Sequence, residues 1–272
     1  MKKSASMLVL LLFLSVVSVS LPQIVGAQAV EDQSYQTITI KPDGSVEPDT
    51  DLLERNGNIY TFKGDIFGTI MVQKSGITID GAGFTISQGG ITLAGPDLSH
   101  RDCRYVLVKN MRLFNSSIYT VGASNNSFIG NYFDRGGIHV QGCANITGDL
   151  IKHNTFRNYT IFVDYNPCGL DIITENNFFD SQIAVGLSDA PIVEKNYWND
   201  YNGTDTNGDG IGDTSYSSHI LDKPVQDDYP LIAPLDLEVI PEFPSWTPLL
   251  IMLLAVTVIA VSYKRKMQSG GI

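Results

Sequence analysis

The chain has 272 residues, a formal net charge of −11, 43% hydrophobic residues and three cysteines. Five of its 18 basic residues lie at positions 2, 3 and 264–266, so the chain between them has 13 basic and 29 acidic residues and a net charge of −16. A field of that sign disfavours nucleic acid and anionic membrane surfaces as partners. It is compatible with calcium, with neutral sugars or simply with solubility in salty surroundings.

Residues 1–29 have the pattern of a secretory signal peptide. A basic start at Met1-Lys2-Lys3 precedes an apolar run from Met7 to Val19, and Ala27-Gln28-Ala29 has the small-x-small pattern of a cleavage site. The alternative is an uncleaved N-terminal anchor, which the short apolar run and the cleavage pattern disfavour. We therefore expect an exported protein and leave this segment out of the fold.

Residues 30–75 contain alternating runs that predict the first strands of an all-β domain. These runs are Thr37-Ile38-Thr39-Ile40, Ile59-Tyr60-Thr61-Phe62 and Ile70-Met71-Val72, with a turn at Pro42-Asp43-Gly44. A stack of parallel strands ends in an open apolar face that must be covered against edge-to-edge association. We therefore expect this segment to include an N-terminal cap.

Residues 76–200 repeat one pattern, in which an apolar strand is followed by Asn, a spacer and a large apolar residue. The asparagines that mark this repeat are evenly spaced, and they are Asn110, Asn131, Asn154, Asn176 and Asn196. A second short strand follows each of the first four at a nearly constant distance, beginning at Ile118, Ile138, Ile161 and Ile183. Two marks per period, both in phase, indicate stacked coils.

The repeat predicts a single-stranded right-handed parallel β-helix with coils of about 22 residues, each about 4.8 Å above the last. No apolar stripe of helical period is present, and the strands are too short and evenly spaced for βαβ units. A β-sandwich is the alternative, but its hairpins should show Asn-Gly turns at shorter spacing. The asparagines would stack at a corner, where Asn tolerates left-handed backbone and its amide can bond to adjacent coils. The inward column would be Leu113 or Phe133, Phe156, Phe178 and Trp198.

The second strands place an outward column on a flat parallel sheet: Tyr119, His139, Phe162 and Ala184, flanked by Gln141 and Asp164. Exposed aromatic rings can stack on sugar rings, and polar neighbours can bond to hydroxyls. The alternative is that loops cover this column, since outward apolar side chains are more often packed than functional. The expected carbohydrate-binding residues are Tyr119, His139, Phe162, Gln141 and Asp164.

Three cysteines in an exported chain leave one unpaired. Cys143 and Cys168 follow Asn131 and Asn154 at nearly equal offsets, which places them in adjacent coils. Stacked coils would bring their Cα atoms within the roughly 4.4–6.8 Å that a disulfide needs, so we expect Cys143 and Cys168 to pair. Two free buried thiols are the alternative.

Five N-x-[ST] sites predict N-glycosylation on turns or strand ends of a secreted domain. A repeat rich in Asn, Ser and Thr also creates such sites by composition alone. The sites are Asn115, Asn125, Asn145, Asn158 and Asn202.

The segment 201–233 is expected to close the C-terminal end and contains an acidic glycine loop from Asp205 to Asp213. It matches Asp-x-Asn-x-Asp-Gly, which places oxygen ligands at alternate positions of a tight turn, and this suits Ca²⁺. The loop resembles calcium loops of the dockerin and thrombospondin type-3 kind, but Tyr216 stands where an EF-hand has Glu, which suggests weak binding. A turn without metal is the alternative. The expected ligands are Asp205, Asn207, Asp209, the carbonyl of Ile211 and Asp213.

Residues 234–246 are a proline-stiffened linker, and residues 247–263 are nearly all apolar. The apolar run lies between Trp246 and Tyr263 and is followed by Lys264-Arg265-Lys266, so we expect a single membrane-spanning helix with the basic tail 264–272 in the cytoplasm. The order of Pro-Glu-Phe, apolar run and basic cluster resembles archaeal C-terminal sorting signals, which would imply a lipid anchor after processing.

The coils resemble archaeal cell-surface proteins with a NosD-like β-helix domain of the carbohydrate-binding and sugar-hydrolase type. The resemblance rests on the run from Ile77 to Ile86, on the Asn-x-Phe coils and on the run from Asn196 to Gly203, and it covers about residues 38–233. The resemblance implies the fold more strongly than an activity, because such families serve several functions. We expect a non-catalytic, membrane-anchored extracellular module that binds glycans or packs into the cell envelope.

A polysaccharide hydrolase, lyase or epimerase is the first alternative. Such an enzyme needs two carboxylates across a groove, or calcium with a basic residue, and the chain lacks clustered Asp-Asp, Gly-His-Gly or Arg-x-Lys patterns. Asp134 and Arg157 fall at the same offset from their asparagines, so a surface ion pair explains them equally well. The candidate catalytic residues would be Asp134, Arg157, Asp164, Asp180 and Asp200.

Copper handling, which the NosD-like resemblance suggests, is a further alternative. Soft copper sites need clustered His, Met or Cys. The expected ectodomain has two methionines, Met71 and Met111, and scattered histidines at positions 100, 139, 153 and 219.

Overall fold

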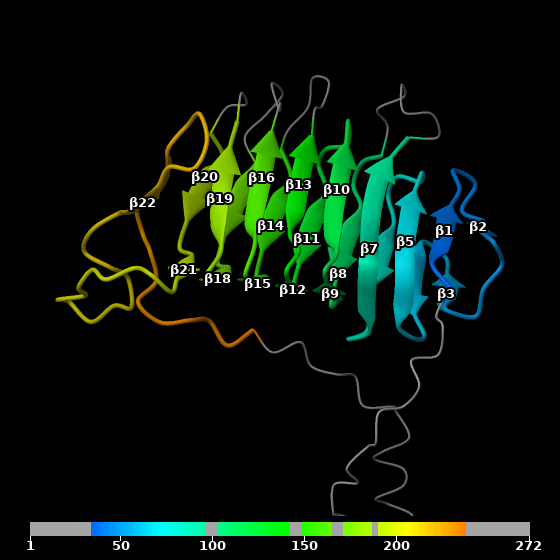
Figure 1. Ribbon diagram of the computed structural model, residues 1–272, viewed down its shortest axis with the longest axis horizontal. Coiled ribbons are helices and arrows are strands. Elements are labelled where there is room, and N and C mark those ends of the chain that lie inside the picture. Colours follow the sequence, from blue (N-terminus) through cyan, green and yellow to red (C-terminus); the bar gives the residue numbers. More distant parts are fainter. Residues whose placement is uncertain (1–33, 96–102, 142–147, 165–170, 187–189, 238–272) are drawn as a thin grey trace, which may run out of the picture. The chain divides into compact units, whose positions relative to one another are not determined.

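The computed structural model describes residues 34–95, 103–141, 148–164, 171–186 and 190–237. These residues form 23 β-strands and no helix. Figure 1 shows strands of successive coils side by side in chain order, and nearly all of their pairings are parallel. Hydrogen bonds between adjacent coils join residues that are 20, 22 or 23 positions apart. The predicted parallel β-solenoid, with a repeat of about 22 residues, is therefore confirmed.

Each regular coil contributes three strands to three stacks. The first stack is β4 (Ile59–Phe62), β6 (Thr78–Asp80), β8 (Leu107–Lys109), β11 (Ser127–Ile129), β14 (Leu150–Lys152), β17 (Ile172–Thr174) and β20 (Ile192–Glu194). The second stack is β9 (Arg112–Phe114), β12 (Tyr132–Asp134), β15 (Thr155–Arg157), β18 (Asn177–Phe179) and β21 (Tyr197–Trp198). The third stack is β10 (Ser117–Val121), β13 (Ile138–Gln141), β16 (Thr160–Asp164) and β19 (Gln182–Val185).

The second and third stacks merge at β7 (Thr85–Ala94), a long strand. Its first part pairs with β9 and its second part with β10, so the two stacks belong to one 13-stranded sheet. The pairing of β7 with β5 shifts register between Ser87 and Gly90. At Gly90 φ is 135°, and a Cβ atom would lie 1.9 Å from the carbonyl oxygen of Ser117. Only glycine allows the next coil to approach this closely.

The core consists of inward side chains from all three stacks, as expected from the alternation along each strand. The predicted inward column of the second stack is confirmed, because its members are at most 1% exposed. Its aromatic rings form a continuous stack, with centroids 4.7 Å apart for Phe133–Phe156, 5.2 Å for Phe156–Phe178 and 4.3 Å for Phe178–Trp198.

Asparagines form a buried ladder at the corner between the first and second stacks. Asn131, Asn154, Asn176 and Asn196 are at most 1% exposed. Each Oδ1 of the last three accepts from the backbone N–H and from the Nδ2 of the preceding Asn, at 2.8–3.1 Å. Each Nδ2 also donates to a strand carbonyl of the preceding coil, at 2.8–3.0 Å. The amides therefore bond to the coils above and below.

Two details of the expected ladder were wrong. Asn110 is not a member, because the strands of its coil pair with residues 20 positions later, as Val108 does with Phe128, whereas Asn131 is 21 positions later. Met111 therefore takes the position that stacks on Asn131. The left-handed corner residue is also not the ladder Asn but the residue before it. These corner residues have φ between 54° and 67° and are Asn110, Gly130, His153, Glu175 and Lys195.

The two ends of the solenoid are built differently from the coils. At the N-terminal end, β1 (Gln36–Ile40) pairs in parallel with β5 (Ile66–Val72), while β2 (Val46–Glu47) and β3 (Leu53–Asn56) pair antiparallel with β1 and β4. At the other end, the antiparallel hairpin of β22 (Tyr216–Ser218) and β23 (Val225–Asp227) covers the last coil. The ring of Tyr216 stacks on Trp198 at 4.2 Å.

Candidate functional site

A groove of about 720 Å³ lies on the outward face of the second stack. Because side chains alternate along a strand, the residues flanking each buried aromatic point outward there. The row that follows the ladder position is Arg112, Tyr132, Thr155 and Asn177, and the next outward row includes Arg157 and Phe179. The groove thus crosses four coils, and each coil adds a polar or aromatic side chain.

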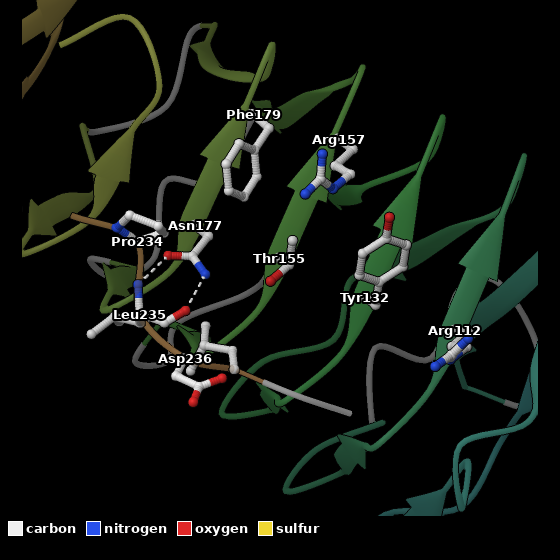
Figure 2. Close-up of a pocket in the computed structure, with 10 residues that line it drawn as sticks. Arg112, Tyr132, Thr155, Arg157, Asn177, Phe179, Pro234, Leu235 and Asp236 are labelled. Atoms are coloured by element: carbon white, nitrogen blue, oxygen red, sulfur yellow. Dashed lines mark hydrogen bonds between the residues drawn. The ribbon is translucent and has the colours of Figure 1, made fainter. Parts of the chain in front are cut away.

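The other wall of the groove is the segment Pro234–Leu237, which we call the strap. The strap is held by Asn177, whose Nδ2 donates to the carbonyl of Leu235 and whose Oδ1 accepts from the amide of Leu235, both at 2.9 Å. Figure 2 shows this pair of hydrogen bonds, with Arg157 and Phe179 on one side of the row of Thr155 and Asn177 and with Asp236 on the other.

The charged side chains of the groove lie in different surroundings. The guanidinium carbon of Arg157 lies 4.2 Å from the ring centre of Phe179, which is a stacked cation–π geometry. Arg112 is exposed two strands away, and Asp236 is the one carboxylate in the described lining. The expected ion pair of Asp134 with Arg157 is not formed. Asp134 instead accepts from Asn158 Nδ2 at 3.3 Å and lies 3.9 Å from Arg135.

The outward column of the third stack does bring three of the expected sugar-binding residues together. The ring of His139 stacks on Tyr119 at 4.7 Å and on Phe162 at 5.1 Å, with interplanar angles of 18° and 15°. His139 also bonds to the hydroxyl of Tyr159 at 3.2 Å, and burial lowers its pKa. The facing sides of these three rings thus cover one another, so a sugar ring cannot insert between them.

The other members of that column differ in their surroundings. Gln141 is exposed beside the column. The backbone of Asp164 belongs to β16, but its side chain lies outside the described part. Ala184 continues the outward column above Phe162, as expected, but it is covered and 0% exposed. Next to it the amide of Lys223 donates to the carbonyl of Val185, so the chain leading into the C-terminal hairpin runs past this strand.

The acidic loop folds back sharply, with φ of 75° at Gly208 and 85° at Gly210. The two carboxylate oxygens of Asp205 accept from three backbone amides of the loop at 2.7–3.2 Å. Asp209 accepts from the amide of Ile211 at 2.9 Å, and Asp213 accepts from the amide of Thr206 at 3.0 Å. The side chain of Asn207 donates to Asp209 at 3.0 Å. Each of the three loop carboxylates is thus an acceptor of at least one hydrogen bond from within the loop.

The loop is also connected to the strap. The amide of Gly212 donates to the carbonyl of Pro230 at 2.8 Å, and the amide of Ile232 donates to the carbonyl of Gly210 at 3.2 Å. The acidic loop and the chain that leads into the strap therefore share one small antiparallel bridge.

The candidate catalytic carboxylates occupy separate places. Asp134 is half-buried on β12, while Asp180 and Asp200 are exposed beyond β18 and β21, where Asp180 accepts from Asn199 and Asp200 from Tyr216. Among the described residues no three His, Cys, Asp or Glu side chains gather in a way that could hold a metal ion. His153 bonds to Glu175 at 2.7 Å, and Met111 is buried in the core.

The remaining expectations fall partly outside the described residues. Cys143, Cys168 and Asn145 lie there, so the disulfide and one glycosylation site stay predictions. Cys103 is a free, buried thiol. Asn158 and Asn202 are exposed, and Asn115 and Asn125 are half-buried. The signal peptide and the expected membrane span also lie outside, and in the part that is described no helix is long and apolar enough to cross a membrane.

The sequence indicated the groove residues only indirectly. They stand one or three positions after the ladder position, on either side of the buried aromatic residue. The alternation that buries Phe156 and Phe178 also turns them outward. The expected binding residues came from the second strand of each coil, so these neighbours were missed. The strap could not be assigned to this face, because Leu235 meets Asn177 across 58 residues of chain.

Comparison with models of known families, with characterised proteins and with solved structures gives no match. The groove itself is therefore the basis on which a function can be proposed.

Proposed function

We propose that this protein is an extracellular, membrane-anchored solenoid that binds polysaccharide in the groove beside the strap, without catalysis. The observation that carries the proposal is the groove itself. It is elongated across four coils, its volume of about 720 Å³ is in the usual range for ligand sites, and it combines the rings of Tyr132 and Phe179 with guanidinium and carboxylate groups. Aromatic surface and fixed polar groups are what sugar rings and their hydroxyls require.

Binding without cleavage is the form that the described lining supports. Both stereochemical routes of glycoside hydrolysis use a pair of carboxyl groups that flank the bond to be cleaved. The described groove lining has one, Asp236. We also propose that the solenoid winds in the right-handed sense, which is the usual hand for parallel connections. Its role at the cell surface would be that of a NosD-like protein.

The deciding experiment compares two tyrosines on different faces. The full chain, purified in mild detergent, is titrated with a panel of soluble polysaccharides by calorimetry. Tyr132→Ala should weaken binding at least about tenfold, which is about 1.4 kcal/mol, while Tyr119→Ala serves as the matched control on the third stack. If Tyr119→Ala abolishes binding and Tyr132→Ala does not, the site is the aromatic column instead. If no polysaccharide binds, the proposal fails.

Calcium in the acidic loop belongs to the same proposal. Asp205, Asn207, Asp209, Asp213 and the carbonyl of Ile211 would hold the ion, which would neutralise the loop and so fix the bridge to the strap. At a Kd near 10⁻³ M, about 10 mM Ca²⁺ would stabilise the folded state by about 1.4 kcal/mol. The melting temperature should rise in such a calcium buffer relative to EDTA, and Asp209→Ala should remove the rise. Equal melting temperatures for the wild type would make the loop only a turn.

The anchor is the last part of the proposal. Residues 247–263 would span the membrane once, with residues 30–245 outside and 264–272 in the cytoplasm. Protease added to intact cells should then digest the solenoid and spare the basic tail. Digestion of the solenoid only after lysis would contradict this orientation.

A further inference from the structure

Two arginines in the groove have no carboxylate partner among the described residues. Arg112 is exposed on β9, and Arg157 is half-buried on β15 with its guanidinium over Phe179. Within the described part of the chain neither guanidinium forms a hydrogen bond or an ion pair. In a chain whose acidic residues outnumber its basic residues by 29 to 18, this lack of pairing is unexpected.

Other basic side chains of the coils do find acidic partners. Lys109 Nζ lies 2.7 Å from Asp80, and Lys152 Nζ lies 3.1 Å from Glu175. Arg135 is the nearest comparison, because it also stacks on a phenylalanine, Phe114, at 4.2 Å, yet it lies 3.9 Å from the carboxylate of Asp134. The two groove arginines therefore differ from these basic side chains of the described surface.

The position of Arg157 suits recognition of a planar anion. Stacking on Phe179 restrains the guanidinium before any ligand arrives, so less side-chain entropy is lost when its donors bind. A guanidinium binds a carboxylate through two parallel N–H···O bonds, which add both energy and geometric specificity. Arg112 is two strands from Arg157, or roughly 10 Å at the usual strand spacing, so both can contact one extended chain.

The opposite wall has the complementary chemistry. Asp236 lies on the strap across the row of Thr155 and Asn177 from Arg157 (Figure 2), so its acceptor oxygens are separate from the guanidinium side of the groove. A sugar chain that lies along the groove would meet the guanidinium of Arg157 on one edge and a hydroxyl acceptor on the other.

We infer that the groove selects acidic polysaccharides, with a uronate carboxylate on Arg157 and a second one on Arg112. This inference rests on the proposed function and names its ligand class. The negative charge of the rest of the chain would repel such a polymer, so the groove provides selectivity by local pairing and not by the long-range field.

The test uses one polymer in two forms. A polyuronate and its carboxyl-reduced, neutral derivative are titrated into the full chain in mild detergent. The polyuronate should bind at least about tenfold more tightly, since hydrogen bonds between charged groups are stronger than those between neutral groups. Arg157→Gln should remove most of this preference, because it should lower the affinity for the polyuronate much more than the affinity for the reduced polymer. Arg112→Gln should have a smaller effect in the same direction, while Arg135→Gln, outside the groove, should change neither affinity more than about twofold.

Each other outcome contradicts the inference in a distinguishable way. Equal affinity for the two forms, still dependent on Tyr132, would leave the polysaccharide groove intact and remove its acidic selectivity. Equal losses of polyuronate affinity in Arg135→Gln and Arg157→Gln would indicate that binding depends on the total charge of the protein and not on the groove. Glu238 and Glu242 lie in the linker of residues 234–246. If the polyuronate binds only after both are changed to Gln, the partner of the two arginines is the linker of this chain and not a polysaccharide. Binding of neither form would overturn the proposed function as well.

Discussion

Two buried polar ladders run along different corners of the same solenoid, and they are built from different side chains. The first is the ladder of four asparagine amides, which ends on Asp227. The second lies where the chain enters the first stack and consists of Asn126, Asp149 and Asp171, all at most 2% exposed. In it, Asn126 and Asp149 donate their backbone N–H groups to the next Oδ1 at 2.8 and 2.7 Å, as the amides do in the first ladder.

The two ladders differ in whether their side chains can donate hydrogen bonds as well as accept them. An amide accepts through Oδ1 and donates through Nδ2, so it can be repeated in every coil, whereas a carboxylate only accepts. The first ladder has its carboxylate at the end, where Asp227 accepts from the amide and side chain of Asn196, from the indole of Trp198 and from two further backbone amides at 2.9–3.2 Å.

The second ladder has a carboxyl group in its middle. Asp149 Oδ1 accepts from the backbone and side chain of Asn126, but Asp149 Oδ2 is buried without a partner among the described residues. Burial, together with the charge of Asp171, raises the pKa of Asp149 to about 8. The surroundings of Asp149 therefore favour the protonated, neutral form of this internal carboxyl group.

Asp149→Asn should produce the largest change, because the amide of Asn is neutral at every pH and needs no bound proton. The pKa of Asp149 is about 8 in the folded protein and 3.8 ordinarily, so the folded state retains a proton that the unfolded chain releases. The contribution of Asp149 to the stability is then greatest below about pH 4 and falls as the pH rises toward 8, with a slope that approaches about 1.4 kcal/mol per pH unit. Urea unfolding from pH 4 to pH 9 should show this decline in the wild type and a flatter profile in the variant. Parallel profiles would mean that Asp149 is ionised in the folded ladder.

Asn154→Ala should break the first ladder at its centre. The change removes the acceptor for the amide and side chain of Asn131 and the donor to Phe128 and Asn176, all in buried surroundings. Buried groups left without partners are expected to lower the free energy of unfolding by about 3–5 kcal/mol in total. Asn199→Ala is the control, because Asn199 is exposed, and it should lower the stability by about 1 kcal/mol or less. Equal losses, measured by urea unfolding, would contradict the central role of the ladder.

Asp227→Asn tests the end of the first ladder with the same substitution as at Asp149. Here one of two accepting oxygens becomes an NH₂ group that faces N–H donors, so the expected loss is about 2–3 kcal/mol. Circular dichroism during thermal unfolding at neutral pH should therefore show opposite shifts for the two Asp-to-Asn variants. Shifts of the same sign would indicate that position in the ladder does not decide the effect.

Met111→Asn should have the smallest effect and tests whether the first ladder can be lengthened. Met111 is buried at the ladder position and its backbone N–H already donates to Asn131 Oδ1 at 3.1 Å. An amide there would gain hydrogen bonds and lose apolar burial, so the free energy of unfolding should change by less than about 1 kcal/mol. Met111→Ala, which only creates a cavity, should lower it by about 2–5 kcal/mol. If the two variants are equally destabilised, the ladder does not accept another member.

Local patterns in the chain were enough to predict the period, the inward and outward phase of each strand and the stacking of four asparagines. Strand alternation decides which side chains are buried, as for Phe156 and Phe178. A constant repeat length then places like side chains above one another in successive coils. Both rules act over one or two coils, so the residues of a short stretch contain all the information that they need.

Contacts between distant segments settled which residues share a column and what covers the outer faces. Asn110 is not part of the asparagine ladder, because the pairing of strands in adjacent coils sets the register and the spacing of the asparagines does not. The ladder of Asn126, Asp149 and Asp171 depends on the same register. The groove requires the strap to return across 58 residues to Asn177, and the burial of Ala184 beside Lys223 likewise involves a distant segment. Such contacts depend on how the chain closes its C-terminal end, which no short stretch of sequence encodes.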